Sequence, residues 1–166
     1  MEISQSVAGI GELHHVAIVV SDLQQSLTLY RDIFGYTVWA DQTYSGTDID
    51  EFTKTTGARI RMVLLQKDGL ERGIVEIQEY QTADGVAIPP DRLPVNLGVY
   101  LISFIVDDID AAYAALSSKG IEFNSPPVEF EVEGTGPLRC AMFRTQDGLG
   151  VEIIELTYAK NASEIN

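Results

Sequence analysis

The chain contains two diverged copies of one structural unit, and this internal repeat restricts its possible folds more than any other feature. In each copy an apolar strand ends at an aspartate, a helix with apolar residues at helical spacing follows, and a glycine ends the helix. Asp22 and Asp108 correspond at an offset of 86 residues, whereas Glu76 and Glu152 on the closing strands correspond at an offset of 76. The first copy is therefore longer, and we place its extra residues in a short helix around Thr47 to Thr56.

Each copy is expected to form a βαβββ module, because further strand-like segments follow each helix. The expected strands are Leu13 to Val20, Tyr36 to Thr43, Ile60 to Gln66 and Ile74 to Tyr80 in the first copy, and Val99 to Val106, Ile121 to Asn124, Arg139 to Arg144 and Val151 to Leu156 in the second. We predict an α+β fold in which two modules, residues 13–80 and 99–156, form a curved mixed sheet with a cup-shaped cavity. Prolines within residues 81–98 exclude a central strand and indicate a linker or a lid inside a single domain of residues 1–166.

The acidic composition excludes several classes of partner. The formal net charge is −14, from 25 acidic and 11 basic residues, so nucleic acid and anionic membranes would be repelled. No stretch of the sequence approaches the roughly 18 consecutive apolar residues of a membrane helix. Cys140 is the single cysteine, which rules out an intrachain disulfide and a thiolate metal cluster. We expect a cytoplasmic protein with a small-molecule substrate.

Strand alternation places three polar side chains on the faces that the helices do not cover. These are His15 on the first strand of the first copy, and Glu76 and Glu152 on the two closing strands. A carboxylate on a half-buried apolar strand is costly unless it is paired or bound to a cation, so these residues are candidate metal ligands. The alternative is that both carboxylates emerge near strand ends, in water or paired with arginine, and that His15 is a hydrogen-bonded structural residue. By the same alternation His14 should face the other way.

Other kinds of chemistry have weaker support in the sequence. Gly148-Leu149-Gly150 precedes a strand and not a helix, so it is not a phosphate-binding loop. No serine lies in a nucleophile motif, and neither does Cys140, which we expect in the core. Lys67 and Arg92 could bind an anionic substrate, but a solvated surface role is the simpler expectation.

Longer motifs carry a resemblance to a known superfamily. The first copy contains His15-Val16-Ala17-Ile18-Val19-Val20-Ser21-Asp22-Leu23 and Leu29-Tyr30-Arg31-Asp32-Ile33-Phe34-Gly35, and the second contains Val106-Asp107-Asp108-Ile109-Asp110-Ala111-Ala112 and Phe143-Arg144-Thr145-Gln146-Asp147-Gly148. These segments resemble the glyoxalase, methylmalonyl-CoA epimerase and bleomycin-resistance group within the vicinal oxygen chelate superfamily. The match covers the chain from about Leu13 to Leu156.

The resemblance implies a metal site with one ligand near the start of each module's first strand and one on each module's last strand. Carried over by position, these are His15, Glu76, Leu101 and Glu152. Leucine cannot bind a metal, and family enzymes usually have a histidine at the position of Leu101. The remaining imidazole and two carboxylates suit a divalent ion such as Mn, Fe, Co, Ni or Zn. Water or substrate would fill the vacancy; otherwise the metal is lost and the cup binds its ligand through apolar contacts.

The resemblance also implies proton-transfer chemistry. The family's enzymes chelate two adjacent substrate oxygens on a metal, which stabilises an enolate while a nearby base moves a proton. We therefore expect an isomerase, epimerase or lyase in which Glu152 or Glu76 is base or ligand, and, from the family's habit, a homodimer. The residues expected to line the substrate pocket are Leu101, Ser103, Ile105, Gln78 and Ile154. The apolar members of this set favour a substrate with apolar bulk.

Two alternative functions are considered, and Leu101 bears on both. The first is a non-catalytic small-molecule binding or sequestration protein, like the bleomycin-resistance members of the family. The second is a ring-cleaving extradiol dioxygenase, which is less favoured because such iron enzymes use two histidines and one carboxylate, and Leu101 replaces the second histidine. A stoichiometric divalent ion would indicate catalysis, and a metal-free cup would indicate binding.

Overall fold

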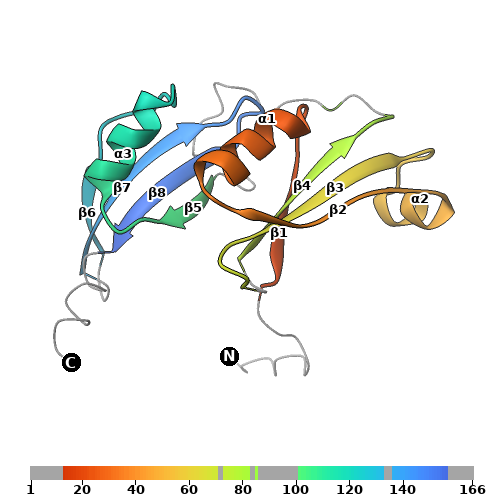
Figure 1. Ribbon diagram of the computed structural model, residues 1–166, viewed down its shortest axis with the longest axis horizontal. Coiled ribbons are helices and arrows are strands. Elements are labelled where there is room, and N and C mark those ends of the chain that lie inside the picture. The colour runs from red at the N-terminus through yellow and green to blue at the C-terminus, as the bar shows by residue number, and fades with distance from the viewer. Residues whose placement is uncertain (1–12, 71–72, 83–84, 86–100, 133–135, 157–166) are drawn as a thin grey trace, which may run out of the picture. The chain divides into compact units, whose positions relative to one another are not determined.

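The computed structural model describes residues 13–70, 73–82, 85, 101–132 and 136–156 (Figure 1). The chain divides into two compact units, Met1–Gly85 and Val86–Asn166. Their boundary falls within residues 81–98, where the sequence predicts a linker, and most of that range lies outside the described residues. None of the helices within the described ranges is long and apolar enough to cross a membrane.

The first unit is a four-stranded mixed sheet with its first helix packed on one face. In chain order its elements are β1 (His15–Val19), α1 (Leu23–Leu27), η1 (Thr28–Ile33), β2 (Thr37–Ser45), α2 (Thr47–Thr53), β3 (Arg59–Gln66) and β4 (Ile74–Tyr80). The strands lie in the order β1-β4-β3-β2, with β1 parallel to β4 and the other neighbours antiparallel. The short helix predicted in the longer copy is present as α2.

The second unit repeats this arrangement. Its elements are β5 (Leu101–Ile105), α3 (Ile109–Ser118), β6 (Val128–Val132), β7 (Gly136–Arg144) and β8 (Gly150–Leu156). The strand order is β5-β8-β7-β6, and β5 is again parallel to its neighbour β8 while the other pairs are antiparallel. The shared topology confirms the predicted α+β class and the internal repeat.

Strand register confirms the two offsets found in the sequence. In the first unit Ala17 pairs with Glu76 across β1 and β4, and in the second unit Ser103 pairs with Glu152 across β5 and β8. The two pairs correspond at offsets of 86 and 76 residues. Because a slip of one residue would turn a side chain to the opposite face, Glu76 and Glu152 must occupy equivalent places on equivalent faces.

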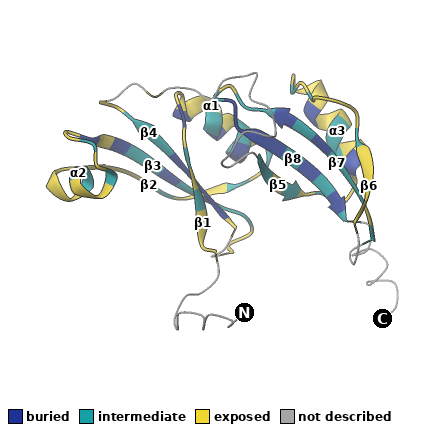
Figure 2. Ribbon diagram, turned by 180° about the vertical axis from the view of Figure 1, so that it is seen from behind, coloured by how far each residue is buried: buried dark blue, intermediate teal, exposed yellow. Residues whose placement is uncertain are grey.

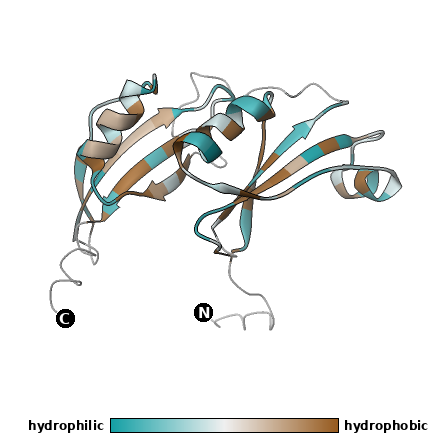
Figure 3. Cartoon of the chain, in the orientation of Figure 1, coloured by the Kyte–Doolittle hydropathy of each residue, from teal (hydrophilic) through white to brown (hydrophobic). Residues whose placement is uncertain are grey.

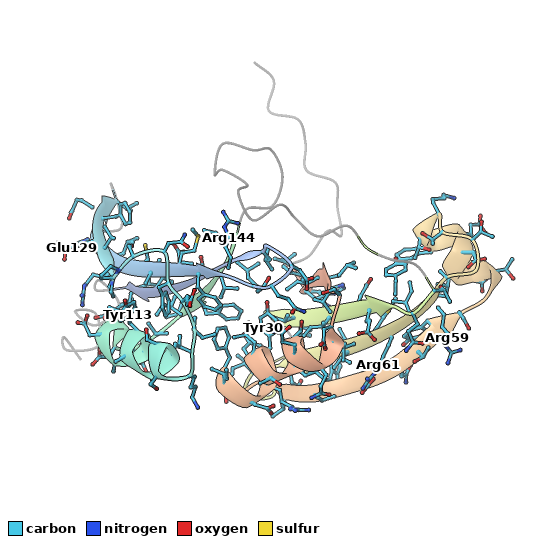
Figure 4. All side chains as sticks on the ribbon, turned by 90° about the horizontal axis from the view of Figure 1, so that it is seen from above. Tyr30, Arg59, Arg61, Tyr113, Glu129 and Arg144 are labelled. Atoms are coloured by element: carbon cyan, nitrogen blue, oxygen red, sulfur yellow. The ribbon has the colours of Figure 1, made fainter. Side chains whose placement is uncertain are left out.

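Apolar side chains between helix and sheet form the core of each unit. Its buried members include Leu23, Leu27, Tyr30, Val63, Leu65 and Ile77 in the first unit, and Ile109, Leu116, Ala141, Phe143, Val151 and Ile153 in the second. Figure 2 shows burial concentrated on the central strands, whereas α2 and β6 are mostly exposed. Tyr30 and Tyr113 project from their helices toward the sheet of their own unit (Figure 4). This packing leaves the opposite face of each sheet free of its first helix.

An aspartate caps the first helix of each unit, as the sequence predicts. Asp22 Oδ1 accepts a hydrogen bond of 2.9 Å from the backbone N–H of Gln25, and Asp108 Oδ1 accepts one of 2.9 Å from that of Ala111. Each bond satisfies one of the N–H groups that the first turn of a helix leaves without a partner. The caps therefore fix where each helix leaves the end of its strand.

A glutamate of the last strand provides a second contact to each helix start. Glu79 Oε1 accepts a hydrogen bond of 3.0 Å from the N–H of Leu23, and Glu155 Oε2 accepts one of 2.8 Å from the N–H of Ile109. Because these contacts join the first helix to the last strand, they tie together segments that are distant in the chain. They occupy the helix-covered faces and leave Glu76 on the other side.

The first helix is one residue longer than its counterpart. Tyr30 corresponds to Leu116 at an offset of 86, but the terminating glycines, Gly35 and Gly120, are 85 residues apart. The extra residue is accommodated by η1, a π-helical stretch with wider turns than an α-helix. Both glycines have positive φ, 72° and 87°, a backbone conformation that ends helices and favours glycine.

The strand predicted at Ile121 to Asn124 is wrong. In this segment Phe123 forms an isolated bridge to Phe143, and the edge strand β6 lies later, at Val128–Val132. Proline residues between the two segments cannot donate to a sheet, so the regular strand begins after them. Within β6, apolar residues alternate with two glutamates, which is the two-residue period of a strand, and all five residues are exposed.

Candidate functional site

The helix-free face of the first unit brings His15 and Glu76 together. His15 begins the edge strand β1, and Glu76 lies in β4, between β1 and β3. His15 Nε2 is 3.4 Å from Glu76 Oε2. Glu76 is only 8% exposed, and its other carboxylate oxygen, Oε1, accepts a hydrogen bond from Nε2 of Gln78. Within the described residues, Glu76 is therefore neither open to water nor paired with an arginine.

His15 has a second contact, with the preceding histidine. The Nδ1 atoms of His14 and His15 are 2.9 Å apart, and the two ring planes meet at 87°. The His14 ring also lies 6.3 Å from the ring of Trp39, which sits at the register shift between Val38 and Ala40 of β2. The prediction that His14 would face away from His15 is wrong, because His14 precedes the first residue of β1 and strand alternation does not set its direction.

The His15 and Glu76 atoms fit a divalent metal ion. Metal–nitrogen and metal–oxygen bonds are about 2.0–2.2 Å long, so two adjacent ligand atoms on one ion lie roughly 3 Å apart. The observed 3.4 Å is close to that spacing, and imidazole and carboxylate are both donors that transition metals accept. Within the described residues, no group of three or more His, Cys, Asp or Glu side chains could hold a metal ion. The first unit thus offers two donors.

The equivalent carboxylate in the second unit, Glu152, has different side chains around it. Glu152 accepts a hydrogen bond from Oγ of Ser103, and the thiol of Cys140 contacts the same carboxylate. Burial, together with the charge of Glu152, raises the pKa of Cys140 to about 11, so this thiol stays protonated at neutral pH. Leu101 takes the register position that His15 has in the first unit. Glu152 therefore meets a hydroxyl and a thiol, where the first unit has an imidazole and an amide.

Four of the five residues predicted to line a substrate pocket lie on the helix-free face of the second unit. Leu101, Ser103 and Ile105 alternate along β5, and Ile154 pairs with Ile105 across β8. Apart from the serine these side chains are apolar, and Ile105 is 71% exposed. Figure 3 shows β5 and β8 as largely hydrophobic strands. Gln78, the fifth residue, belongs to the first unit.

Sequence reasoning missed part of this face. By strand register, Met142 and Cys140 of β7 and Val128 and Phe130 of β6 lie on the same side as Glu152. The misplaced strand concealed the two β6 residues, although their alternation with glutamates could have located them. Cys140, which was expected in the core, is half-buried on this face instead.

Lys67 has a structural contact at the end of the first helix. Its Nζ donates a hydrogen bond of 2.7 Å to the carbonyl of Phe34 and lies 5.7 Å from the centre of the Tyr36 ring. A cation at this position satisfies carbonyl groups at a helix C-terminus. Arg92, the other candidate for binding an anionic substrate, lies outside the described residues.

Comparison with known proteins gives a family match over most of the chain. The family model "Glyoxalase/Bleomycin resistance protein/Dioxygenase superfamily" matches residues 12–153. "Uncharacterized protein YaeR" of Escherichia coli (strain K12) is 26% identical over 149 residues, which cover 89% of this chain and 98% of that protein.

Several solved structures share the fold. A glyoxalase family protein from Bacillus cereus has a TM-score of 0.74 at 19% identity, covering 90% of this chain and 98% of its own. A glyoxalase/dioxygenase from Nostoc punctiforme has a TM-score of 0.61 at 19% identity, covering 93% and 97% of the two chains. A glyoxalase family protein from Enterococcus faecalis has a TM-score of 0.60 at 24% identity, covering 87% and 97%. Similarity at these identities shows a common fold.

Proposed function

Because the chain belongs to the glyoxalase/bleomycin resistance protein/dioxygenase superfamily, we propose that it is an isomerase, epimerase or lyase that moves a proton beside a substrate carbonyl. The proposed ligands of a divalent ion, such as Mn, Fe, Co, Ni or Zn, are His15 and Glu76 of the first unit. Glu152, the third ligand that the sequence predicts, belongs to the second unit and stays a prediction as a ligand. The proposed base is Glu152 or Glu76. The observation that carries this proposal is the contact of 3.4 Å between His15 and the buried Glu76.

The surroundings of Glu76 favour a cation at this position. Taking a carboxylate out of water is costly, and a neutral imidazole with one amide offsets only part of that cost. Gln78 holds Oε1 of Glu76, while Oε2 is directed at Nε2 of His15. A divalent ion bound by Nε2 and Oε2 would neutralise the buried charge. A protonated His15 that pairs with Glu76 is the purely structural alternative.

The chain's own groups would orient the substrate and move its proton. When bound, a divalent ion supplies Lewis acidity toward two adjacent substrate oxygens. Glu152 is oriented by the hydroxyl of Ser103 and the thiol of Cys140, and its carboxylate can accept a proton from a carbon beside a carbonyl. Gln78 orients Glu76 in the same way.

The apolar face of the second unit favours a substrate with an apolar body. Leu101, Ile105 and Ile154 can bury such a body at about 25 cal/mol per Å² of apolar surface. We propose a small molecule that carries adjacent oxygens, or a carbonyl with an acidic α-proton, on an apolar frame. We further propose that the protein acts as a homodimer in the cytoplasm.

A non-catalytic binding protein is the second candidate. Leu101 takes the position of His15 in the second unit, so Glu152 has no imidazole at the corresponding place. An open apolar face can hold a ligand by burial of apolar surface without any metal. Such a protein would sequester a small molecule without turning it over.

Metal titration tests the proposed ligands. We expect chelator-treated protein to bind about one Mn²⁺ or Zn²⁺ per chain in a calorimetric titration, and His15→Ala, Glu76→Gln and Glu152→Gln each to bind at least about tenfold more weakly, because each removes a ligand. Glu129→Gln removes an exposed carboxylate from β6 and controls for the lost charge. Unchanged affinity in all three ligand variants would exclude this metal site.

A variant that is expected to bind metal more tightly provides a further test in the same titration. Leu101→His would place an imidazole beside Glu152 at the register position that His15 has beside Glu76. We expect this variant to bind the same metal several-fold more tightly than the wild-type protein. Weaker or unchanged binding would show that this part of the second unit does not contribute to the metal site.

A further inference from the structure

The contact between His14 and His15 carries an inference about the first proposed ligand. We propose that His14 is a positioning residue, which fixes the ring orientation and the tautomer of His15. This inference rests on the proposed metal-binding function. Histidines that bind a metal almost always donate their other ring N–H to a neighbouring acceptor, and loss of that neighbour weakens metal affinity. His15 has such a neighbour in Nδ1 of His14, at 2.9 Å.

The two ring nitrogens of His15 are directed at different partners. Nε2 lies 3.4 Å from Oε2 of Glu76, and Nδ1 lies 2.9 Å from Nδ1 of His14. A neutral imidazole has one N–H donor and one nitrogen with a free lone pair. When the proton is on Nδ1 and is donated to His14, the lone pair of Nε2 is available for a cation shared with Glu76. In the opposite tautomer a proton on Nε2 blocks that position.

His14 is itself held by an aromatic neighbour. Its ring lies 6.3 Å from the Trp39 ring at an interplanar angle of 48°. Trp39 is at the register shift between Val38 and Ala40, and bulges of this kind redirect a side chain from its regular strand direction. The backbone carbonyl of His14 accepts a hydrogen bond of 3.4 Å from the N–H of Ile74, and the contact with Trp39 further limits the positions that the His14 ring can take.

Matched substitutions of His14 distinguish its role as a hydrogen-bond acceptor from the space that its side chain fills. His14→Leu has a side chain of similar size but removes the acceptor, whereas His14→Asn keeps an acceptor oxygen close to the position of Nδ1. We expect His14→Leu to bind Zn²⁺ about tenfold or more weakly than the wild-type protein, in line with the loss of an outer partner of a metal ligand. We expect His14→Asn to restore most of this affinity.

Nuclear magnetic resonance gives a readout that does not depend on activity. Long-range ¹H–¹⁵N spectra of the metal-free protein at pH about 8, where free imidazole is neutral, report which ring nitrogen carries the proton. We expect the His15 proton on Nδ1 in the wild-type protein and in His14→Asn. A proton on another nitrogen of His15 in the wild-type protein would overturn the proposal.

His15→Ala serves as the reference for a lost ligand. If it abolishes zinc binding while His14→Leu binds like the wild-type protein, the positioning role is overturned and the metal site stands. If His14→Asn binds as weakly as His14→Leu, His14 is itself a ligand and positioning is again overturned. If His15→Ala leaves zinc affinity unchanged, the metal site is wrong and both proposals fail. Should His14→Leu not fold, Trp39→Leu, which keeps both histidines, is expected to weaken zinc binding several-fold.

Discussion

Glu152 and Glu155 lie three residues apart on β8 and have different roles because strand alternation turns them to opposite faces. Glu155 faces the helix and accepts a hydrogen bond from the N–H of Ile109, whereas Glu152 faces the other side. The first unit repeats this division between Glu79 and Glu76. One glutamate of each last strand therefore contacts the start of a helix, and the other lies on the helix-free face.

Removing the Glu155 carboxylate is expected to destabilise the protein without affecting metal binding. Glu155→Ala leaves the N–H of Ile109 without this acceptor in a buried setting and should lower the free energy of unfolding by about 1–2 kcal/mol. Glu155→Gln keeps an acceptor oxygen and should cost less. Urea denaturation measures both, and Glu129→Ala, an exposed glutamate of β6, is the control. Equal stability of Glu155→Ala and the control would contradict the capping role.

At the scale of elements, the π-helical stretch η1 should tolerate the loss of one residue. The buried positions Leu23, Leu27 and Tyr30 precede the extra residue, so deletion of the exposed Asp32 should convert η1 to a regular helical end with the same buried side chains. We expect the free energy of unfolding to change by less than about 1 kcal/mol, as for surface changes that leave the core intact.

The matched deletion in the second unit should have a larger effect. Deleting Ala115 of α3 would rotate Leu116 by about 100° around the helix and move it out of the core. Exposing that side chain should cost about 1.5–3 kcal/mol. Thermal or urea unfolding compares the two deletions, and a smaller loss for the α3 deletion than for Asp32 would contradict our account of η1.

Most elements could be predicted because local patterns and tertiary packing agree. The caps Asp22 and Asp108, the closing strands and the helix-ending glycines all follow from short-range spacing. The edge strand β6 was missed because it follows prolines and all five of its residues are exposed, so burial does not mark it in the sequence. The π-helical form of η1 was missed because apolar spacing up to Tyr30 is the same in both copies, and the extra residue comes only afterwards.

The candidate site was predictable only in part. Alternation and the repeat placed His15 and Glu76 on faces that the helices do not cover, and the structure brings the two side chains together. The contact of His14 with His15 could not be foreseen, because His14 lies outside the strand and its ring meets Trp39 from the other edge of the sheet. Strand periodicity gives no information about a residue before the first ladder pair. The metal itself stays a prediction.

On the scale of the whole molecule, the two copies share one backbone topology and differ in the side chains on their helix-free faces. At equivalent register positions the first unit has His15 and Gln78 where the second has Leu101 and Ile154. The helix-free face of the first unit is thus polar around its buried carboxylate, while that of the second is largely apolar. Taken by itself, the face of the first unit suits a polar, chelatable group, and that of the second suits an apolar one.

The proposed chemistry makes a prediction about solvent protons. If Glu152 takes a proton from carbon and returns one, turnover in deuterated water should place deuterium at the carbon beside the substrate carbonyl, unless the base shields its proton from exchange. A panel of apolar compounds with adjacent oxygens, analysed by mass spectrometry and proton NMR, would detect the label. Label in the absence of protein, or with heat-denatured protein, sets the background rate.

Steady-state kinetics can distinguish a role of Glu152 as a base from a role in substrate binding alone. Glu152→Gln should lower kcat by roughly 100-fold or more, the usual contribution of a general base, while KM changes much less. Glu129→Gln should leave both constants unchanged, because its carboxylate lies on the exposed edge strand. Oxygen consumption with ring cleavage would contradict proton transfer and favour a dioxygenase. Tight binding of every compound without turnover would instead favour sequestration, because a bound compound that never exchanges its α-proton is not deprotonated by the protein.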